Sequence, residues 1–230
     1  MPQVRPLEPH HFSAVGDLAY RAFADLDSRQ GRDGATDAPN QLWYSMRTAH
    51  IQGTDPGGCF ALVADDGTLA GVSLALRREG VWGLSLLAVD PAHQESGGGR
   101  ALIEASLAYA EPGDARLILA SDDSRAIRLY ARSGHRLIPA MDAEGPLRRC
   151  PEMPASVRPG VWPDDVEIVD AAGRAVRGAN YGRDVGLYVI MGAGFFVHED
   201  GGFVIARGGS PAVLAATDPD AAADLLRACL

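Results

Sequence analysis

Apolar residues recur along the chain with a helical period in some segments and a strand period in others. Apolar positions three and four residues apart predict helices over 9–24, 40–51, 99–110 and 124–133. Short apolar runs bounded by glycine, proline or aspartate predict strands over 3–6, 60–64, 69–77, 81–89, 116–120 and 136–139. Strands followed by alternating helices and strands are typical of a mixed sheet flanked by helices, so the fold class is α/β (α+β).

The order of elements is found twice along the chain. Residues 4–6 and 157–159 share the sequence Val-Arg-Pro, and positions 17–22 match 170–175 in the same register. Further correspondences follow in order: 60–67 with 195–201, 86–91 with 214–219, and 102–107 with 225–230. Internal similarity of this kind indicates a repeated structural unit. The second copy is shorter, because only residues 220–222 stand where the first copy has residues 92–99.

These features predict two domains and a linker. The first domain covers residues 1–140, a proline-rich linker covers 141–163, and a truncated second copy covers 164–230. The second copy ends before any counterpart of Tyr130, so we expect it to have a structural or dimerisation role. Its last strand, 212–216, would leave an open sheet edge, which packing onto the first copy or pairing in a homodimer would cover.

Composition excludes several classes of protein. The chain has 230 residues and 21 basic side chains, all of them arginine, so chemistry that needs a lysine is excluded. The formal net charge of −9 argues against a nucleic-acid partner. The longest uncharged stretch, residues 185–197, is too short to cross a membrane, and the N-terminus resembles no signal peptide. We therefore expect a cytoplasmic protein without a membrane partner.

Metal and disulfide chemistry are not expected. Cys59, Cys150 and Cys229 lie far apart, with no Cys-x-x-Cys pair and no histidine at ligand spacing. The sequence also contains neither Gly-x-Ser-x-Gly nor His-Glu-x-x-His, which argues against an esterase or a zinc protease.

The strongest chemical signal is the glycine-rich loop 94–99 between a strand and a helix. Small residues before a helix N-terminus let backbone N–H groups converge on a phosphate, although a plain turn is the alternative reading. Leu102 stands where a dinucleotide-binding motif would have its third glycine, so that motif does not fit.

Two motifs in this region resemble those of the GNAT superfamily of acyl-CoA N-acyltransferases. Gln94-x-x-Gly97-x-Gly99 matches the family's phosphate-loop signature. Downstream, Asp123-x-x-Ala126-x-x-x-Tyr130 followed by Gly134-His135 is similar to the family's second signature. The resemblance implies a GNAT-like, mainly antiparallel sheet and acetyl-CoA as co-substrate, with no metal.

The resemblance also implies roles for particular residues. Tyr130 would be the general acid that protonates the departing thiolate, although a tyrosine on a helix can also be a core residue. Acetyl-CoA would bind at three groups of residues: the strand end Leu87, Ala88 and Val89; the loop Gln94, Glu95, Ser96, Gly97, Gly98, Gly99 and Arg100; and the helix residues Asp123, Ala126 and Tyr130.

The general base and the acceptor site are less determined by the sequence. Glu79 is one candidate base, and a water held by Ser85 or by a main-chain carbonyl is another. Trp43 and Tyr44 belong either to the core or to the acceptor site. The loop 28–39 is a candidate substrate lid or a loop without a role.

The sequence therefore predicts an N-acetyltransferase that transfers an acetyl group from acetyl-CoA to a primary amine of a small molecule or peptide. The alternative is a catalytically silent acyl-CoA-binding or dimerisation module.

Overall fold

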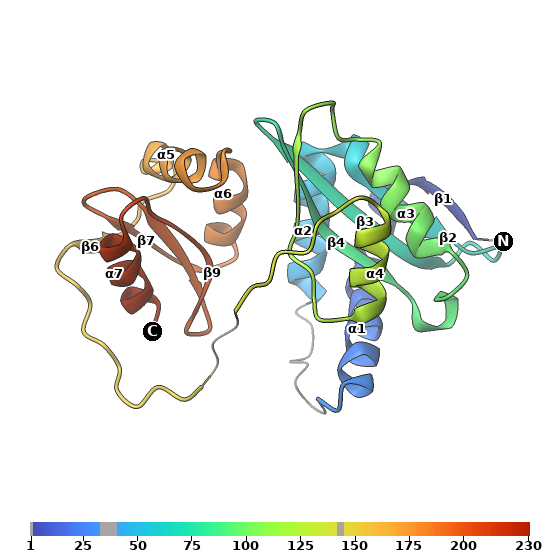
Figure 1. The fold of residues 1–230 in the computed structure, drawn as a ribbon, viewed down its shortest axis with the longest axis horizontal. Coiled ribbons are helices and arrows are strands. Elements are labelled where there is room, and N and C mark those ends of the chain that lie inside the picture. The colour runs from blue at the N-terminus through green and yellow to red at the C-terminus, as the bar shows by residue number, and fades with distance from the viewer. Residues whose placement is uncertain (1, 33–40, 142–144) are drawn as a thin grey trace. The chain divides into compact units, whose positions relative to one another are not determined.

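The protein consists of two compact units in a computed structural model that describes residues 2–32, 41–141 and 145–230. The first unit covers Met1–Pro139 and the second covers Ala140–Leu230 (Figure 1). Each unit has its own sheet, its own helices and its own core, so each is described by itself.

The first unit is built on one twisted sheet. Its strands are β1 (Gln3–Pro6), β2 (Cys59–Val63), β3 (Leu69–Arg78), β4 (Val81–Val89) and β5 (Ala115–Ile118). They lie in the order β1-β2-β3-β4-β5, antiparallel except for the parallel pair β4 and β5. The helices are α1 (Phe12–Arg29), α2 (Gln41–Thr54), α3 (Gly98–Leu107) and α4 (Ser124–Arg132).

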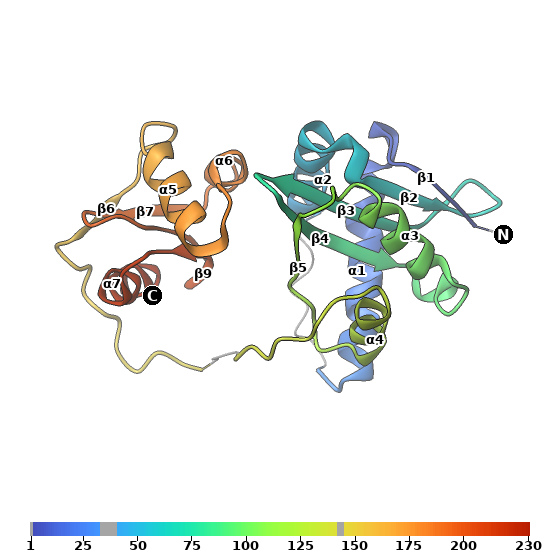
Figure 2. The ribbon, with the colours of Figure 1, turned by 45° about the horizontal axis from the view of Figure 1, so that its top comes forward.

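Helices cover both faces of this sheet (Figures 1 and 2). Helices α1 and α2 pack on β3, and α3 packs on β2, β3 and β4 from the other face. Leu18 of α1 lies in a core with Val72 and Leu74 of β3, whereas Leu102 of α3 lies in a separate core with Leu62. The sheet is therefore the middle layer of three, as its two apolar faces require.

Strand β4 carries an irregularity that changes which face its side chains occupy. Leu86 pairs with Leu74 but Leu84 pairs with Ala75, so Ser85 is an extra, bulged residue. Before the bulge Trp82 belongs to the core on the α3 side, and after it Leu86 and Ala88 belong to the core on the α1 side. A bulge shifts the two-residue alternation by one, which explains this exchange of faces.

The two central strands also separate at this point. The parallel pairing of β4 with β5 ends at Leu84 and Ile118. The remainder of β4, from Ser85 to Val89, continues along β3 without a β5 partner in the described residues. The sheet therefore opens between β4 and β5.

The second unit repeats this order of elements up to its third helix. Its elements are β6 (Val157–Pro159), α5 (Val166–Arg177), α6 (Gly182–Ile190), β7 (Gly194–His198), β8 (Phe203–Arg207), β9 (Ser210–Ala215) and α7 (Pro219–Cys229). The strands form an antiparallel sheet in the order β6-β7-β8-β9. Val169 of α5 and Val185 of α6 pack on one face of it, and Leu225 of α7 packs on the other.

Two predicted boundaries of the sheets differ from the structure. Residues 136–139 form no strand, and Leu137 and Ile138 are exposed. The predicted linker 141–163 includes strand β6, whose Val157 pairs with His198 of β7, so the sheet of the second unit begins before residue 164. Among the residues described, none of the helices combines the length and the apolar composition that crossing a membrane requires.

Candidate active site

A cleft of about 1000 Å³ lies in the first unit around the opening of the sheet. Strand β4, the loop after it and helices α1, α3 and α4 all contribute to its walls. Eleven of the predicted cofactor-binding positions line it: Leu87, Ala88, Val89, Gln94, Glu95, Gly97, Gly99, Arg100, Asp123, Ala126 and Tyr130. Two sequence motifs about thirty residues apart are thus brought together in one cavity.

Hydrogen bonds fix the start of the loop to the end of strand β4. The Gln94 side-chain amide donates to the main-chain oxygen of Val89 at 3.0 Å. Asp90 accepts from the Ala92 N–H at 3.0 Å and pairs with Arg21 of α1 at 2.7 Å. The glutamine at the first position of the motif therefore bridges the loop to the strand that precedes it.

The loop itself turns sharply before α3 begins. Glu95 has a φ of 62° and Gly97 a φ of 86°, the left-handed region in which only glycine is unstrained. Turns of this kind form concave rows of N–H groups that bind anions, and the N-terminus of α3 follows directly. The two other predicted loop residues do not line the cleft: Gly98 is buried beside Leu62, and Ser96 is exposed, with its hydroxyl donating to the His93 carbonyl at 2.7 Å.

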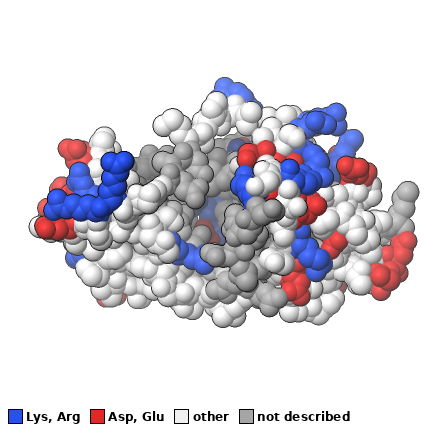
Figure 3. All heavy atoms as spheres, turned by 90° about the horizontal axis from the view of Figure 1, so that it is seen from below, with Lys and Arg blue, Asp and Glu red and all other residues white. Residues whose placement is uncertain are grey.

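Arginines outnumber carboxylates along the cleft, although the chain as a whole is acidic. Three carboxylates line it, Glu95, Glu104 and Asp123. The lining arginines come from three helices and are Arg29, Arg100, Arg125, Arg128 and Arg132. Some of these arginines have carboxylate partners, such as Arg100 with Glu104 at 2.7 Å. Arginines and carboxylates also lie close to one another on the face shown in Figure 3. The cleft therefore suits a ligand with several negative charges, such as one carrying phosphates.

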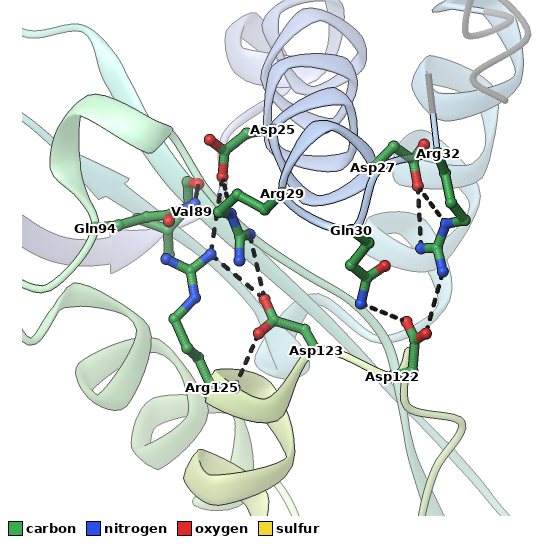
Figure 4. Close-up of polar contacts among 10 residues, drawn as sticks. All are labelled: Asp25, Asp27, Arg29, Gln30, Arg32, Val89, Gln94, Asp122, Asp123 and Arg125. Atoms are coloured by element: carbon green, nitrogen blue, oxygen red, sulfur yellow. Dashed lines mark hydrogen bonds and ion pairs between the residues drawn. The ribbon is translucent and has the colours of Figure 1, made fainter. Parts of the chain in front are cut away.

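A polar network joins the end of α1 to the segment before α4 (Figure 4). Arg29 pairs with Asp123 at 3.5 Å, and Arg32 pairs with Asp122 at 3.1 Å. Gln30 also donates to Asp122, at 2.9 Å. Burial alone would raise the pKa of Asp123, but the Arg125 N–H and the charges of Arg125 and Arg29 outweigh it and lower this pKa. Asp123 is therefore a charged N-cap that holds the start of α4 against α1.

Tyr130 lines the cleft from α4, whose end is fixed by a well-defined cap. Gly134, with a φ of 90°, donates to Ala131, and the His135 N–H donates to the Tyr130 carbonyl at 3.1 Å. These bonds form a Schellman motif, which explains the Gly-His pair of the sequence. Burial, assisted by the charge of Asp123, raises the pKa of the Tyr130 phenol to about 12. The phenol is therefore protonated at neutral pH and able to donate a proton.

The remaining predicted site residues lie away from the cleft. Glu79 is exposed in the turn between β3 and β4, at the opposite end of β4 from the loop. Trp43 is buried in α2, and Tyr44 packs against the core between α2 and the sheet. Ser85 is the bulged residue, and its hydroxyl and carbonyl oxygens accept hydrogen bonds from Arg47. Most of the candidate lid 28–39 falls outside the described residues, and Ser28 and Arg29 belong to α1.

Sequence reasoning missed the contributions of α1 and most of those of α4. Ala22, Phe23 and Leu26 of α1 line the cleft although no motif includes them. Arg125, Arg128 and Arg132 carried a usable signal, since their spacing places them on one face of a helix. Within the described part of the chain, no group of three or more His, Cys, Asp or Glu side chains is arranged to hold a metal ion.

Comparison with known proteins identifies the family of the chain. The model of the acetyltransferase (GNAT) family matches residues 20–135, which include the cleft and both motifs. The chain therefore belongs to the GNAT family, whose members are acetyltransferases that use acetyl-CoA as co-substrate. No curated protein matches the sequence significantly.

Solved structures support the same fold over both units. A candidate acetyltransferase from Pyrococcus horikoshii is 16% identical, with a TM-score of 0.71 over 99% of this chain and 75% of that one. A GCN5-related N-acetyltransferase from Sphaerobacter thermophilus is 18% identical, with a TM-score of 0.55 over 99% of this chain and 81% of that one. At these identities the likeness concerns the fold alone.

Proposed function

We propose that this enzyme transfers the acetyl group of acetyl-CoA to a primary amine of a small molecule or peptide. The observation that carries the proposal is the cleft, where the open end of β4, a glycine-rich loop at a helix N-terminus, an excess of arginines and a protonated tyrosine meet. The loop and the arginines would hold the phosphates, and the main chain of Leu87 and Val89, on the side of β4 where β5 no longer pairs, would bind the pantetheine arm.

The proposed chemistry is a direct attack of the amine on the thioester. A C–N bond forms at the carbonyl carbon, main-chain N–H groups at the opened strand polarise the carbonyl oxygen, and the C–S bond breaks. Tyr130 gives its proton to the departing thiolate, the proton of the amine passes to water, and water returns a proton to the Tyr130 phenolate. Glu79 is not retained as the base, because it lies in the β3–β4 turn away from the cleft.

We further propose that the first unit alone is catalytic and that the second is a truncated copy of it with a structural role. The shared order of elements and strand pairings supports this reading. In the second unit only residues 216–218 lie between β9 and α7, and Asp218 is the N-cap of that helix. The nearby pocket is lined by Asp200, Asp218, Asp220 and Asp224, which would repel phosphates.

Binding of acetyl-CoA tests the cofactor site directly. Acetyl-CoA should raise the melting temperature of the wild type, since a ligand at a hundred times its Kd stabilises by about 2.7 kcal/mol. Gly99→Glu should abolish this shift, because it puts a carboxylate among the phosphates, and a Cβ at Gly99 meets no atom closer than 3.7 Å.

The matched control is Gly53→Glu on α2, where a Cβ meets nothing within 4 Å. This variant should melt and bind like the wild type. A wild type that acetyl-CoA does not stabilise, or a Gly99→Glu variant that it stabilises equally, contradicts the proposed site.

Turnover then separates the enzyme from its alternative. Release of free thiol from acetyl-CoA, screened over small amines and N-terminal peptides, should identify an acceptor that accelerates it. Binding of acetyl-CoA with no acceptor-dependent thiol release would instead favour a silent acyl-CoA-binding module.

A further inference from the structure

The bulge in β4 lies where the sheet opens, and the Arg47 side chain of α2 forms hydrogen bonds to it. Arg47 donates from Nε to the Ser85 hydroxyl at 3.0 Å and from Nη2 to the same oxygen at 2.7 Å. Nη2 also donates to the Ser85 carbonyl oxygen. One guanidinium thus binds both the side chain and the main chain of the bulged residue, across 38 positions of sequence.

This contact gives the Ser85 carbonyl a hydrogen-bond donor at the point where the regular pairing of β4 is interrupted. Pairing with β5 ends at Leu84, and the pairing with β3 shifts around Ser85. A half-buried carbonyl in such a position needs another donor, because leaving it unpaired costs free energy comparable to a lost hydrogen bond. Arg47, itself half-buried, supplies that donor.

Fastening the carbonyl also sets the direction of the next N–H. The peptide bond is planar and trans, so its C=O and N–H point in opposite directions. When Arg47 fixes the Ser85 carbonyl, it therefore fixes the Leu86 N–H and the start of the open segment that leads to Leu87 and Val89. A planar guanidinium with several donors suits this task better than a single ammonium group.

We propose that Arg47 is a positioning residue for acyl transfer: by clamping the Ser85 bulge from α2, it aims the open main chain of β4 at the thioester carbonyl. The inference rests on the proposed function. Arg47 and Ser85 do not line the cleft, so Arg47 acts through the strand and does not touch the substrate.

The test measures polarisation of the bound thioester and requires no acceptor. Acetyl-CoA labelled with ¹³C at the thioester carbonyl is bound to each variant, and the carbonyl resonance is compared with that of free acetyl-CoA. In the wild type the resonance should move downfield. In Arg47→Met most of this displacement should be lost, while the Kd for acetyl-CoA, set by the phosphate loop, stays unchanged.

Two further variants should lose part of the displacement of the carbonyl resonance. Arg47→Lys keeps the charge but cannot reach both Ser85 oxygens in the same way, so it should lose much of the displacement. Ser85→Ala keeps the carbonyl contact and should lose less. The control is Arg5→Met on β1, whose exposed guanidinium binds Gln3 at 2.8 Å and should leave the displacement as in the wild type.

Each outcome decides the proposal. A full downfield displacement in Arg47→Met, or none in the wild type, overturns the positioning role while the binding site stands. Should Arg47→Met fail to melt cooperatively, Arg47→Lys decides by the same criterion. A wild type that does not bind acetyl-CoA overturns both the proposed function and this inference.

Discussion

Tyr130 is the general acid in the proposed mechanism. It lines the cleft from α4, and burial together with the charge of Asp123 raises its pKa to about 12. The phenol therefore keeps its proton throughout the neutral range and is in its acid form when acetyl-CoA binds. The same burial means that removing the whole ring would also disturb packing, so the informative change is the removal of one oxygen.

Tyr130→Phe should bind acetyl-CoA as the wild type does but lower kcat by about 100-fold or more. Acceptor-dependent thiol release and the Kd for acetyl-CoA measure the two effects separately. Tyr20→Phe on α1, where the side chain is 40% exposed, is the control and should change neither. Equal kcat values for Tyr130→Phe and the wild type would remove Tyr130 from the mechanism.

The imidazole ring of His135 lies in a place where an apolar ring would also fit. Its two ring nitrogens are buried and have no hydrogen-bond partner among the described residues. The ring centroid lies 6.1 Å from that of Trp82. Burial, together with the charge of Arg116, lowers the pKa of His135 below its usual value of 6.5. The imidazole is therefore neutral at physiological pH and fills space.

Protonation of His135 should destabilise the first unit. The unfolded chain takes up the proton near pH 6.5 but the folded chain does so only at lower pH, so stability is full above that pH and is lost as pH falls. His135→Phe should raise the melting temperature at pH 7.5 by removing unpaired polar atoms, each worth about 1–3 kcal/mol. The same substitution should also reduce the decrease in melting temperature between pH 7.5 and pH 5.

Melting curves at a series of pH values measure both effects. His10→Phe, at an exposed position, is the matched control and should leave the pH profile unchanged. A His135→Phe variant that loses as much stability on acidification as the wild type would show that His135 is not the titrating group.

At the level of elements, the spacing of apolar residues predicted most of the helices and strands of the first unit. Strands β1 and β4 begin and end where the pattern predicts, and α3 begins one residue earlier. Helix α1 continues beyond the predicted end at residue 24 to Arg29, where Arg29 and Asp25 form an ion pair at 2.9 Å. Side-chain pairs of this spacing extend a helix beyond its apolar stripe.

The predicted strand at 136–139 shows what period alone does not determine. Leu137 and Ile138 have the residue types of a strand, yet no strand pairs with them and they are 65% and 70% exposed. A strand needs a neighbour, and local sequence carries no information about whether one is available. Conversely, Val157–Pro159 looked like part of a linker but forms β6 because β7 pairs with it.

The candidate site shows the same difference between what local sequence determines and what depends on distant segments. Motif spacing predicted a loop and a tyrosine that the structure brings together in one cleft, because local backbone geometry needs glycines and a helix at fixed positions. The contact of Arg47 with Ser85, the lining residues of α1 and the position of Glu79 depend on how distant segments pack. Sequence alone held no signal for those three.

At the scale of the whole molecule, two units with the same order of elements have different loops between sheet and helix. In the first unit the residues between β4 and α3 form the proposed phosphate loop, and in the second only residues 216–218 lie between β9 and α7. The proposed loop therefore has no counterpart in the second unit, which nevertheless has its own sheet and core. This agrees with the proposal that the second unit is structural, because a fold does not require a functional site.

The open edge of β5 is the surface by which we expect two copies to form a homodimer. In the described part of the chain no strand pairs with the outer side of β5, whereas the edge strand β9 contains Pro211, which discourages pairing. The first unit also exposes Leu119 (91%) and Ile138 (70%) near its end, and large apolar side chains on a surface favour association.

Replacing Leu119 and Ile138 together by aspartate should therefore lower the molar mass in light scattering from that of a dimer to that of a monomer, since apolar contact is lost and like charges meet across the interface. Ile190→Asp, at a position in α6 that is 73% exposed, is the matched control and should stay dimeric. A monomeric wild type would contradict the homodimer, and a double variant that stays dimeric would move the interface away from β5. Acetyl-CoA should stabilise all three proteins alike, because none of the changed residues lines the cleft.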